Sequence, residues 1–408
     1  MKVDKTLINT LNKANVLNAI RKQEHIFRAE IARITDLSIP TVMKITEEFI
    51  DKGLVRESGK GQSTGGKPPQ LLELIPDAYY IVGVDIGTTY IVTILMDLSA
   101  SVIQNDRIPT EIKSNPISIV NRVIESIQRT IMNSGVDYNK IMGISLGVPG
   151  LLDASKGNVL FSPDFQWENV HILKPIKDKF NIPVIIDNVT RAMAMGEKWF
   201  GLAKDINNFI CINLGHGIGA AIVVNGEIYG GSSGAAGEFG HITLKKDGPV
   251  CDCGNRGCLE ALASANAISK KARAMIDKGI HTKILDMVDD NLEKIEAKHV
   301  FDAAKQGDAL SIGIIEEATQ YLGIAIAGLI NLLDPELIIL EGGVARAGDI
   351  LIQNVKAVVR ERQMKYAGKQ TRIVTSELSL VAAIGAATFI LKAFIESGGD
   401  IDNWSLNI

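Results

Sequence analysis

The sequence predicts an α/β protein with a small N-terminal domain and a larger, two-lobed body. Residues 6–75 carry helical apolar spacing followed by two short strand patterns. Beyond Pro76, buried strands alternate with amphipathic helices. A strand that ends in a polar glycine turn occurs twice, near Asp85 and near Leu214, which indicates duplicated halves with a cleft between them. We therefore expect three units: residues 1–75, 76–198 and 199–408.

The composition is that of a globular protein, with 46% hydrophobic and 22% charged residues. Apolar runs such as Tyr80–Val84 are too short to span a bilayer, so no membrane partner is expected. No signal peptide is recognisable at the N-terminus, which makes the cytoplasm the expected location. Residues 1–75 contain 12 Lys and Arg against 9 Asp and Glu, although the whole chain has a net charge of -4. A basic head on an acidic body favours nucleic-acid binding by the head.

The first 75 residues predict a winged helix-turn-helix. The expected elements are helices over 6–23, 28–34 and 38–53, and strands over 54–58 and 70–74. Ser38 is a good N-cap and Pro40 suits a first helical turn, so the third helix should begin there. The stretch from Gly59 to Ser63 is expected to be the loop of the wing.

Such a motif reads DNA by placing the N-terminal turn of its last helix in the major groove. The residues expected to face base edges are Ile39, Pro40, Thr41 and Lys44. Ser38 and the helix N-terminus would meet a phosphate, Arg28 would reach the backbone, and Lys60 lies in the wing. The alternative is a three-helix packing module that does not contact DNA.

Beyond the head, the elements expected in order are strands over 80–85, 91–96 and from about 100, a helix over 117–132, strands over 141–146 and 209–214, a hairpin at 225–226, a helix over 322–333, a strand over 337–340 and a closing helix over 381–394. Cys211 falls in the strand at 209–214 and is expected to be a buried residue.

One short stretch combines a histidine with three cysteines. His241, Cys251, Cys253 and Cys258 supply a complete tetrahedral set for Zn²⁺ with no position for water, so the metal would be structural. Free thiols that lie close by chance are the alternative, and a disulfide is disfavoured because nothing marks the chain as secreted. Glu238 and Glu260 bracket the cluster. A rigid metal site would fix these carboxylates for hydrogen bonding to sugar hydroxyls.

The run from Gly237 to Glu260 closely resembles the signature of the ROK family, named for repressors, open reading frames and sugar kinases. The resemblance extends over essentially the whole chain, and it implies an actin-like (ribonuclease H-like) sugar kinase fold whose C-terminal helix returns to the first lobe. It also implies zinc on the histidine and three cysteines. The residues it places at the sugar pocket are Asp164, Asn188, Glu238, His241 and Glu260, with Asp164 standing where the family often has Asn.

The segment Gly65–Pro69 resembles the linker of ROK repressors that approaches the DNA minor groove. Gly66 and Lys67 therefore join the predicted DNA contacts. The family has Arg where this chain has Lys67. Because Arg is favoured in narrow minor grooves, Lys67 could weaken selectivity for A·T pairs.

At several positions that the resemblance assigns to phosphoryl transfer, this chain departs from the family pattern. The two phosphate turns carry Thr88 where Gly is usual and His216 where Thr is usual. Counting back from Glu197 places Val189 on the catalytic Asp, and valine cannot accept a proton. Asp187 is a poor substitute base, since on a strand it would lie about 6–7 Å from Val189.

The sequence therefore predicts a sugar-responsive transcriptional repressor of carbohydrate-metabolism genes, and not an enzyme. Its expected partners are operator DNA and a monosaccharide, with structural Zn²⁺ and a homodimer or dimer of dimers as the assembly. An active ATP-dependent sugar kinase with an added DNA-binding domain is one alternative. A repressor that senses a protein partner is another. Val189 places an apolar group where the phosphorylated hydroxyl would meet a carboxylate, so a pentose such as xylose, which lacks the CH₂OH arm, is a conceivable effector. Glucose stays open as well.

Overall fold

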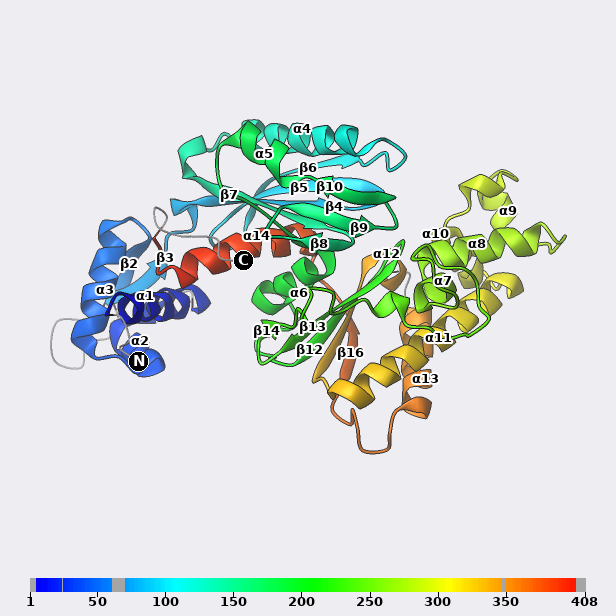
Figure 1. Ribbon diagram of the computed structural model, residues 1–408. Helices are drawn as coiled ribbons and strands as arrows, with labels where there is room; N and C mark the ends of the chain where they lie inside the picture. Colours follow the sequence, from blue (N-terminus) through cyan, green and yellow to red (C-terminus); the bar gives the residue numbers. More distant parts are fainter. Residues whose placement is uncertain (1–4, 24, 61–69, 347–348, 401–408) are drawn as a thin grey trace.

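The computed structural model describes residues 5–23, 25–60, 70–346 and 349–400. Figure 1 shows a helical head at the left, a first lobe above and a second lobe at the lower right. Between the lobes lie α6 (Val189–Phe200) and the closing helix α14 (Val381–Glu396). Gly66 and Lys67, which the sequence places at DNA, lie outside the described residues.

The head consists of three helices and a small antiparallel sheet. They are α1 (Lys5–Lys22), α2 (Arg28–Thr35), α3 (Ile39–Asp51), β1 (Ile26–Phe27), β2 (Val55–Lys60) and β3 (Gln70–Leu74), with the strands in the order β1-β3-β2. The start predicted for the third helix is confirmed, because the Ser38 side chain accepts a hydrogen bond from the Thr41 amide at 3.3 Å. The loop expected at Gly59 and Lys60 is wrong at both residues. An irregularity between Glu57 and Gly59 lets β2 continue pairing with β3.

The first lobe is a five-stranded sheet covered on both faces. Its strands, in spatial order, are β11 (Val184–Asn188), β7 (Ile141–Val148), β4 (Tyr80–Ile86), β5 (Tyr90–Asp97) and β6 (Val102–Pro109). On one face lie α4 (Pro116–Ser134) and α5 (Leu173–Phe180), while α14 covers β4 and β7 on the other. A separate sheet of β8 (Leu151–Asp153), β9 (Asn158–Ser162) and β10 (Trp167–His171), not predicted from the sequence, carries Asp164 in the turn between β9 and β10.

The second lobe repeats this sheet. Its strands, in spatial order, are β14 (Glu227–Ile228), β13 (Ile218–Val224), β12 (Phe209–Leu214), β15 (Leu337–Glu341) and β16 (Arg372–Thr375). In both lobes the first strand pairs antiparallel with the next strand and parallel with a later one, so β4 and β12 are equivalent. The predicted duplication is therefore confirmed. The helices of this lobe are α7 (Leu259–Ala263), α8 (Ala265–Ile276), α9 (Ile284–Met287), α10 (Ala297–Lys305), α11 (Ala309–Leu333), α12 (Gly342–Ala345) and α13 (Asp349–Arg362).

One hydrophobic core joins the head to the first lobe. It contains Leu17 and Phe49 from the head, Ile81 from β4, and Ala387 and Phe394 from α14. Because a continuous core resists shear, the head and the first lobe form one packed unit. A second core fills the space between the sheet of the second lobe and its helices.

Helix α11 is the longest in the described part of the chain and is long and apolar enough to cross a membrane. Half of its most apolar stretch is buried inside the molecule, against helices that include α7, α10 and α13. A core helix passes the same test of length and apolarity, so α11 is explained by the packing of the second lobe.

Candidate metal centre and ligand pocket

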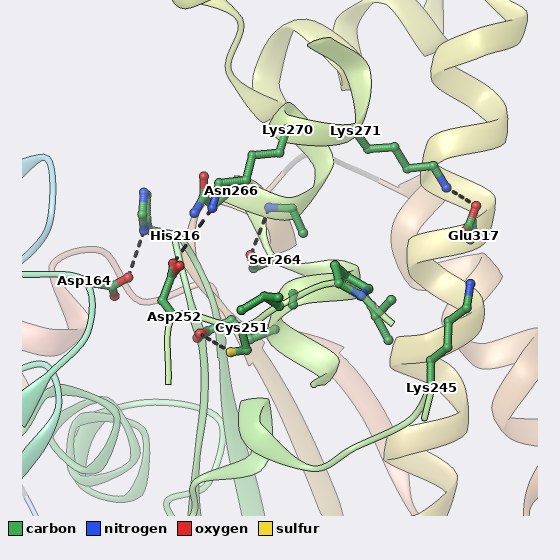
Figure 2. A pocket seen from close by; sticks show the side chains of 16 residues that line it. Asp164, His216, Lys245, Cys251, Asp252, Ser264, Asn266, Lys270, Lys271 and Glu317 are labelled. Carbon is green, nitrogen blue, oxygen red and sulfur yellow. Dashed lines mark hydrogen bonds and ion pairs between the residues drawn. The ribbon is translucent and has the colours of Figure 1, made fainter. Parts of the chain in front are cut away.

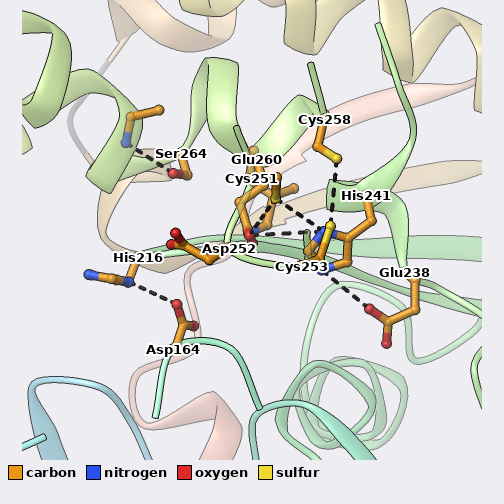
Figure 3. Close-up of polar contacts among 12 residues, drawn as sticks. Asp164, His216, Glu238, His241, Cys251, Asp252, Cys253, Cys258, Glu260 and Ser264 are labelled. Carbon is orange, nitrogen blue, oxygen red and sulfur yellow. Dashed lines mark hydrogen bonds and ion pairs between the residues drawn. The ribbon is translucent and has the colours of Figure 1, made fainter. Parts of the chain in front are cut away.

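His241, Cys251, Cys253 and Cys258 converge on one point, and their ligand atoms all lie within 4.8 Å of one another. A tight turn at Phe239–His241 presents the imidazole, and Cys258 directly precedes α7 (Figure 3). The two sulfur-bearing turns need positive backbone angles, with φ of +95° at Gly254 and +67° at Gly257, which glycine adopts without strain. The expected convergence of the four side chains is thus present.

The spacing of these atoms fits a tetrahedral metal ion. Two thiolates held at about 2.3 Å from one Zn²⁺ lie roughly 3.8 Å apart. The Cys253 and Cys258 sulfurs are 3.8 Å apart, and the Cys251 sulfur lies 3.7 Å from Nδ1 of His241. The cysteines are free thiols, since a disulfide requires a separation of about 2.05 Å. The donor set can therefore bind a metal ion.

Two carboxylates approach the imidazole of this cluster. Oε2 of Glu238 lies 3.7 Å from Nε2 of His241, and Oε1 of Glu260 lies 4.0 Å from Nδ1. The other oxygen of Glu260 accepts the Ile218 amide at 2.9 Å, and burial raises the pKa of this carboxyl group. Glu260 is thus fixed by the β12–β13 turn on one side and by the metal cluster on the other.

Asp164 crosses from the first lobe to meet His216 of the second. Nδ1 of His216 lies 3.0 Å from Oδ1 of Asp164, and this contact raises the pKa of the imidazole. Gly217 lies beside both acidic groups, because a Cβ there would be 2.4 Å from Glu260 and 3.4 Å from Asp164. Both Asp164 and His216 are positions where the sequence departs from the kinase pattern, and the structure pairs them.

A cavity of about 360 Å³ opens beside this pair and the metal cluster (Figure 2). Its lining includes two of the predicted sugar residues, Asp164 and Glu260. Among the described residues that line it, Asn188, Glu238 and His241 are not found. The lining also has lysines, two of them paired with acids: Lys270 lies 3.9 Å from Asp252, and Lys271 pairs with Glu317. Such a mixed lining suits a polar ligand without a large net charge.

The segment around Val189 differs from the geometry expected for it. Strand β11 ends at Asn188, whose side chain caps α6 by accepting the Thr190 amide at 2.8 Å. Val189 is the first residue of α6 and is buried in an apolar cluster, so the expectation that it lies on a strand with Asp187 is wrong. Asp187 itself is engaged: it accepts the Asn188 amide at 2.6 Å and lies 3.5 Å from Arg191.

The predicted DNA-contacting residues lie in different parts of the head. Ser38, Ile39, Pro40 and Lys44 are exposed at the start of α3, and Thr41 is half-buried there. Ile39 is 51% exposed, which leaves it available for contact. Arg28 is half-buried and donates hydrogen bonds at 3.0 Å to Thr46 and to Glu57. Lys60 lies at the end of β2.

Sequence reasoning missed several residues of this region. Lys245, Asp252, Lys270 and Lys271 line the cavity, and Arg191 donates to the Gly234 carbonyl at 2.6 Å in the loop before Glu238. Lys245 and Asp252 lie within the run from Gly237 to Glu260, so their nearness to the cluster could have been predicted from the sequence. Lys270, Lys271 and Arg191 fall outside that run.

Comparison with known proteins gives a consistent set of relatives. The model of the ROK family matches residues 81–393. The chain is 32% identical over 373 residues to a xylose repressor from Caldicellulosiruptor bescii, covering 91% of this chain and 93% of that protein. It superposes with a TM-score of 0.82 on a crystal structure of a ROK family transcriptional regulator homologous to the Escherichia coli MLC protein, at 28% identity, covering 96% of this chain and 98% of the other. A ROK family glucokinase from Streptomyces griseus, in complex with glucose and AMPPNP, is 27% identical with a TM-score of 0.67, covering 76% of this chain and 98% of the kinase.

Proposed function

The chain belongs to the ROK family, and we propose that it is a sugar-responsive repressor of carbohydrate-metabolism genes. The head is the observation that carries this proposal. The glucokinase matches 76% of this chain, whereas the transcriptional regulator matches 96%. The part of this chain that the glucokinase lacks thus has a counterpart in the transcriptional regulator. Its three helices, with the exposed start of α3, are suited to DNA binding.

In this proposal, the head is a winged helix-turn-helix and α3 enters the major groove. Ile39, Pro40, Thr41 and Lys44 face base edges, and Ser38 with the helix N-terminus meets a phosphate. Lys60, Gly66 and Lys67 supply contacts from the wing and linker. Arg28 supports the head, because its hydrogen bonds to Thr46 and Glu57 join α2 to α3 and β2. A homodimer or dimer of dimers would present paired heads to a palindromic operator in the cytoplasm.

The metal is Zn²⁺, held by His241, Cys251, Cys253 and Cys258. Three thiolates and an imidazole favour Zn²⁺ over Mg²⁺ or Ca²⁺, which prefer oxygen ligands. With four protein ligands the ion has no open position, so it holds the loop in place and activates no water. Its place beside Glu238 and Glu260 makes it a support for the sugar pocket.

The effector is a neutral monosaccharide bound between the lobes. Glu238, Glu260 and His241 lie on the second lobe, whereas Asp164 and Asn188 come from the first. These groups can accept or donate hydrogen bonds to hydroxyls on different faces of a sugar ring. A ligand that contacts both lobes favours the closed cleft by its differential affinity for that state. Xylose and glucose are both candidates.

We expect no kinase activity. The position of the catalytic base is occupied by Val189, and Asp187 is engaged by Arg191 and by the Asn188 amide. Loss of a positioned base costs on the order of 10²- to 10⁴-fold in rate. A coupled assay for ADP with ATP and either xylose or glucose should stay at the level without sugar, with a ROK glucokinase as the positive control. Sugar-dependent ADP production at the rate of that control would favour the alternative, an active sugar kinase.

Titration of the full-length protein with monosaccharides tests the repressor proposal. We expect one sugar to bind by calorimetry and to weaken binding to DNA from the protein's own promoter region at least about tenfold, within the usual range of allosteric coupling. The variant Lys44→Ala is the matched control, because Lys44 is exposed on α3 and far from the pocket in sequence. It should bind the sugar normally and DNA poorly. Sugar binding with no effect on DNA affinity would contradict the proposal.

A further inference from the structure

Helix α6 contacts the head and both lobes. It begins after Asn188, which caps it, and one side packs on β12 and β13 of the second lobe. The other side packs along α14, which covers the sheet of the first lobe (Figure 1). Its last turn carries Trp199, which lies against α1 of the head. A single helix thus runs from the predicted sugar site to the DNA-binding head.

Helices α6 and α14 pack so closely that neither can be displaced independently of the other. A Cβ added at Gly385 of α14 would lie 1.7 Å from the Ala192 carbonyl oxygen of α6. A Cβ at Gly196 would lie 2.8 Å from the Val381 carbonyl oxygen. The two backbones are therefore in direct contact, and a displacement at one end of α6 is not absorbed by flexible side chains in the middle. A displacement at the Asn188 end of α6 must therefore reach the Trp199 end.

At that other end, Arg21 of α1 stacks on Trp199. The guanidinium carbon lies 4.0 Å from the ring centroid. Two nitrogens of the same group donate to Oδ1 of Asn18, at 3.3 and 3.1 Å, which fixes its orientation over the ring. Burial lowers the pKa of Arg21 to about 10, as expected for a desolvated cation. Cation–π contacts are strongest where water is excluded, so this one is specific rather than a chance surface contact.

We propose that the Arg21–Trp199 contact transmits sugar occupancy from α6 to the DNA-binding head. The inference rests on the proposed repressor function and names the residues that carry its regulation. When the lobes close on a sugar, α6, α14 and the head turn together as one packed unit, and the Arg21–Trp199 contact holds α1 to α6 during this movement. The shared core of the head and the first lobe leaves the head no independent hinge within the described residues. Arg21 and Trp199 are positioning residues and bind neither ligand.

The variant Arg21→Met tests this, because it removes the charge and keeps the length of the side chain. We expect its affinity for sugar and its affinity for DNA without sugar to stay within about threefold of wild type. The weakening of DNA binding by sugar should fall from at least about tenfold to less than about threefold. Lys22→Met is the matched control: Lys22 is the next residue on α1 and is exposed, so its loss should leave the coupling unchanged.

A double-mutant cycle separates a specific contact from general loosening. Trp199→Leu alone should lose the coupling to the same extent as Arg21→Met, and the double variant should lose no more. Arg21→Lys, which keeps a cation over the ring, should restore part of it and guards against a folding defect. If Arg21→Met binds both ligands and retains full coupling, the inference is overturned while the repressor function stands. If the wild type shows no coupling, the proposed function itself fails.

Discussion

The variant Cys258→Ser is expected to lose the proposed Zn²⁺ and the proposed response to sugar. Cys258 is fully buried, and its sulfur lies 3.8 Å from that of Cys253. A hydroxyl in its place is a poor ligand, because zinc sites of this kind are built from thiolate and imidazole. The remaining three ligands would leave an open and weaker site. Since Cys258 directly precedes α7, which carries Glu260, the loss reaches the proposed sugar pocket.

The size of the effect follows from what the metal holds in place. Binding of structural zinc contributes directly to folding, so we expect a loss of at least about 3 kcal/mol in the free energy of unfolding. Glu238 and Glu260 would no longer be fixed. Two hydrogen bonds to charged groups, at about 1.5 kcal/mol each, correspond to roughly a 100-fold loss of sugar affinity.

Elemental analysis, thermal unfolding and sugar calorimetry measure the three parts of this prediction. Cys211→Ala is the matched control, because Cys211 is a fully buried thiol on β12 outside the cluster. It should keep one zinc per chain, although the small cavity it creates lowers stability by about 1 kcal/mol. A Cys258→Ser protein that binds sugar as tightly as wild type would show that the metal does not support the pocket.

Local patterns predicted most of the fold. Ser38 marked the start of α3, and two strand-and-glycine-turn patterns marked β4 and β12, because capping and strand burial depend on residues close in sequence. The small sheet of β8, β9 and β10 was missed. Its strands have no clean alternation, and its partners are set by tertiary contacts. Gly59 and Lys60 were placed in a loop, because glycine usually ends a strand, whereas here an irregular register keeps them paired.

The site was predictable where its residues are adjacent in sequence. The four metal ligands fall within the stretch from His241 to Cys258, so their spacing alone indicated a common centre. The contact of Asp164 with His216 joins residues 52 positions apart on different lobes, and Arg21 meets Trp199 across an even longer separation. No sequence period relates such pairs. They follow from how the lobes and the head are packed.

The variant Glu341→Gln is expected to stabilise the protein at alkaline pH. Glu341 ends β15 and is 2% exposed, beside the fully buried Glu197. One of its oxygens has no hydrogen-bond partner among the described residues. Glu197 accepts hydrogen bonds from Ser376 and from the Leu202 amide. Burial and then the Glu197 contact raise the pKa of Glu341 from 4.5 to about 9.

The direction of the pH dependence follows from this raised pKa. Below about pH 4.5 the carboxyl group is protonated in both the folded and the unfolded chain, so it contributes no pH-dependent penalty. Between pH 4.5 and about 9 only the unfolded chain releases the proton, and stability falls as the pH rises. Glutamine has no proton to lose and can donate a hydrogen bond to Glu197, so the variant avoids this loss.

Urea unfolding at a series of pH values measures the difference between variant and wild type. It should be small at pH 5 and grow by up to about 1.4 kcal/mol per pH unit, reaching on the order of 3 kcal/mol at pH 8. Glu316→Gln, the same chemical change at an exposed position on α11, should give no such slope. A difference that is constant from pH 5 to pH 8 would mean that Glu341 is already charged in the folded protein. In that case a cation or water must stabilise the buried pair, because two adjacent carboxylates do not both ionise in a site without compensating charge.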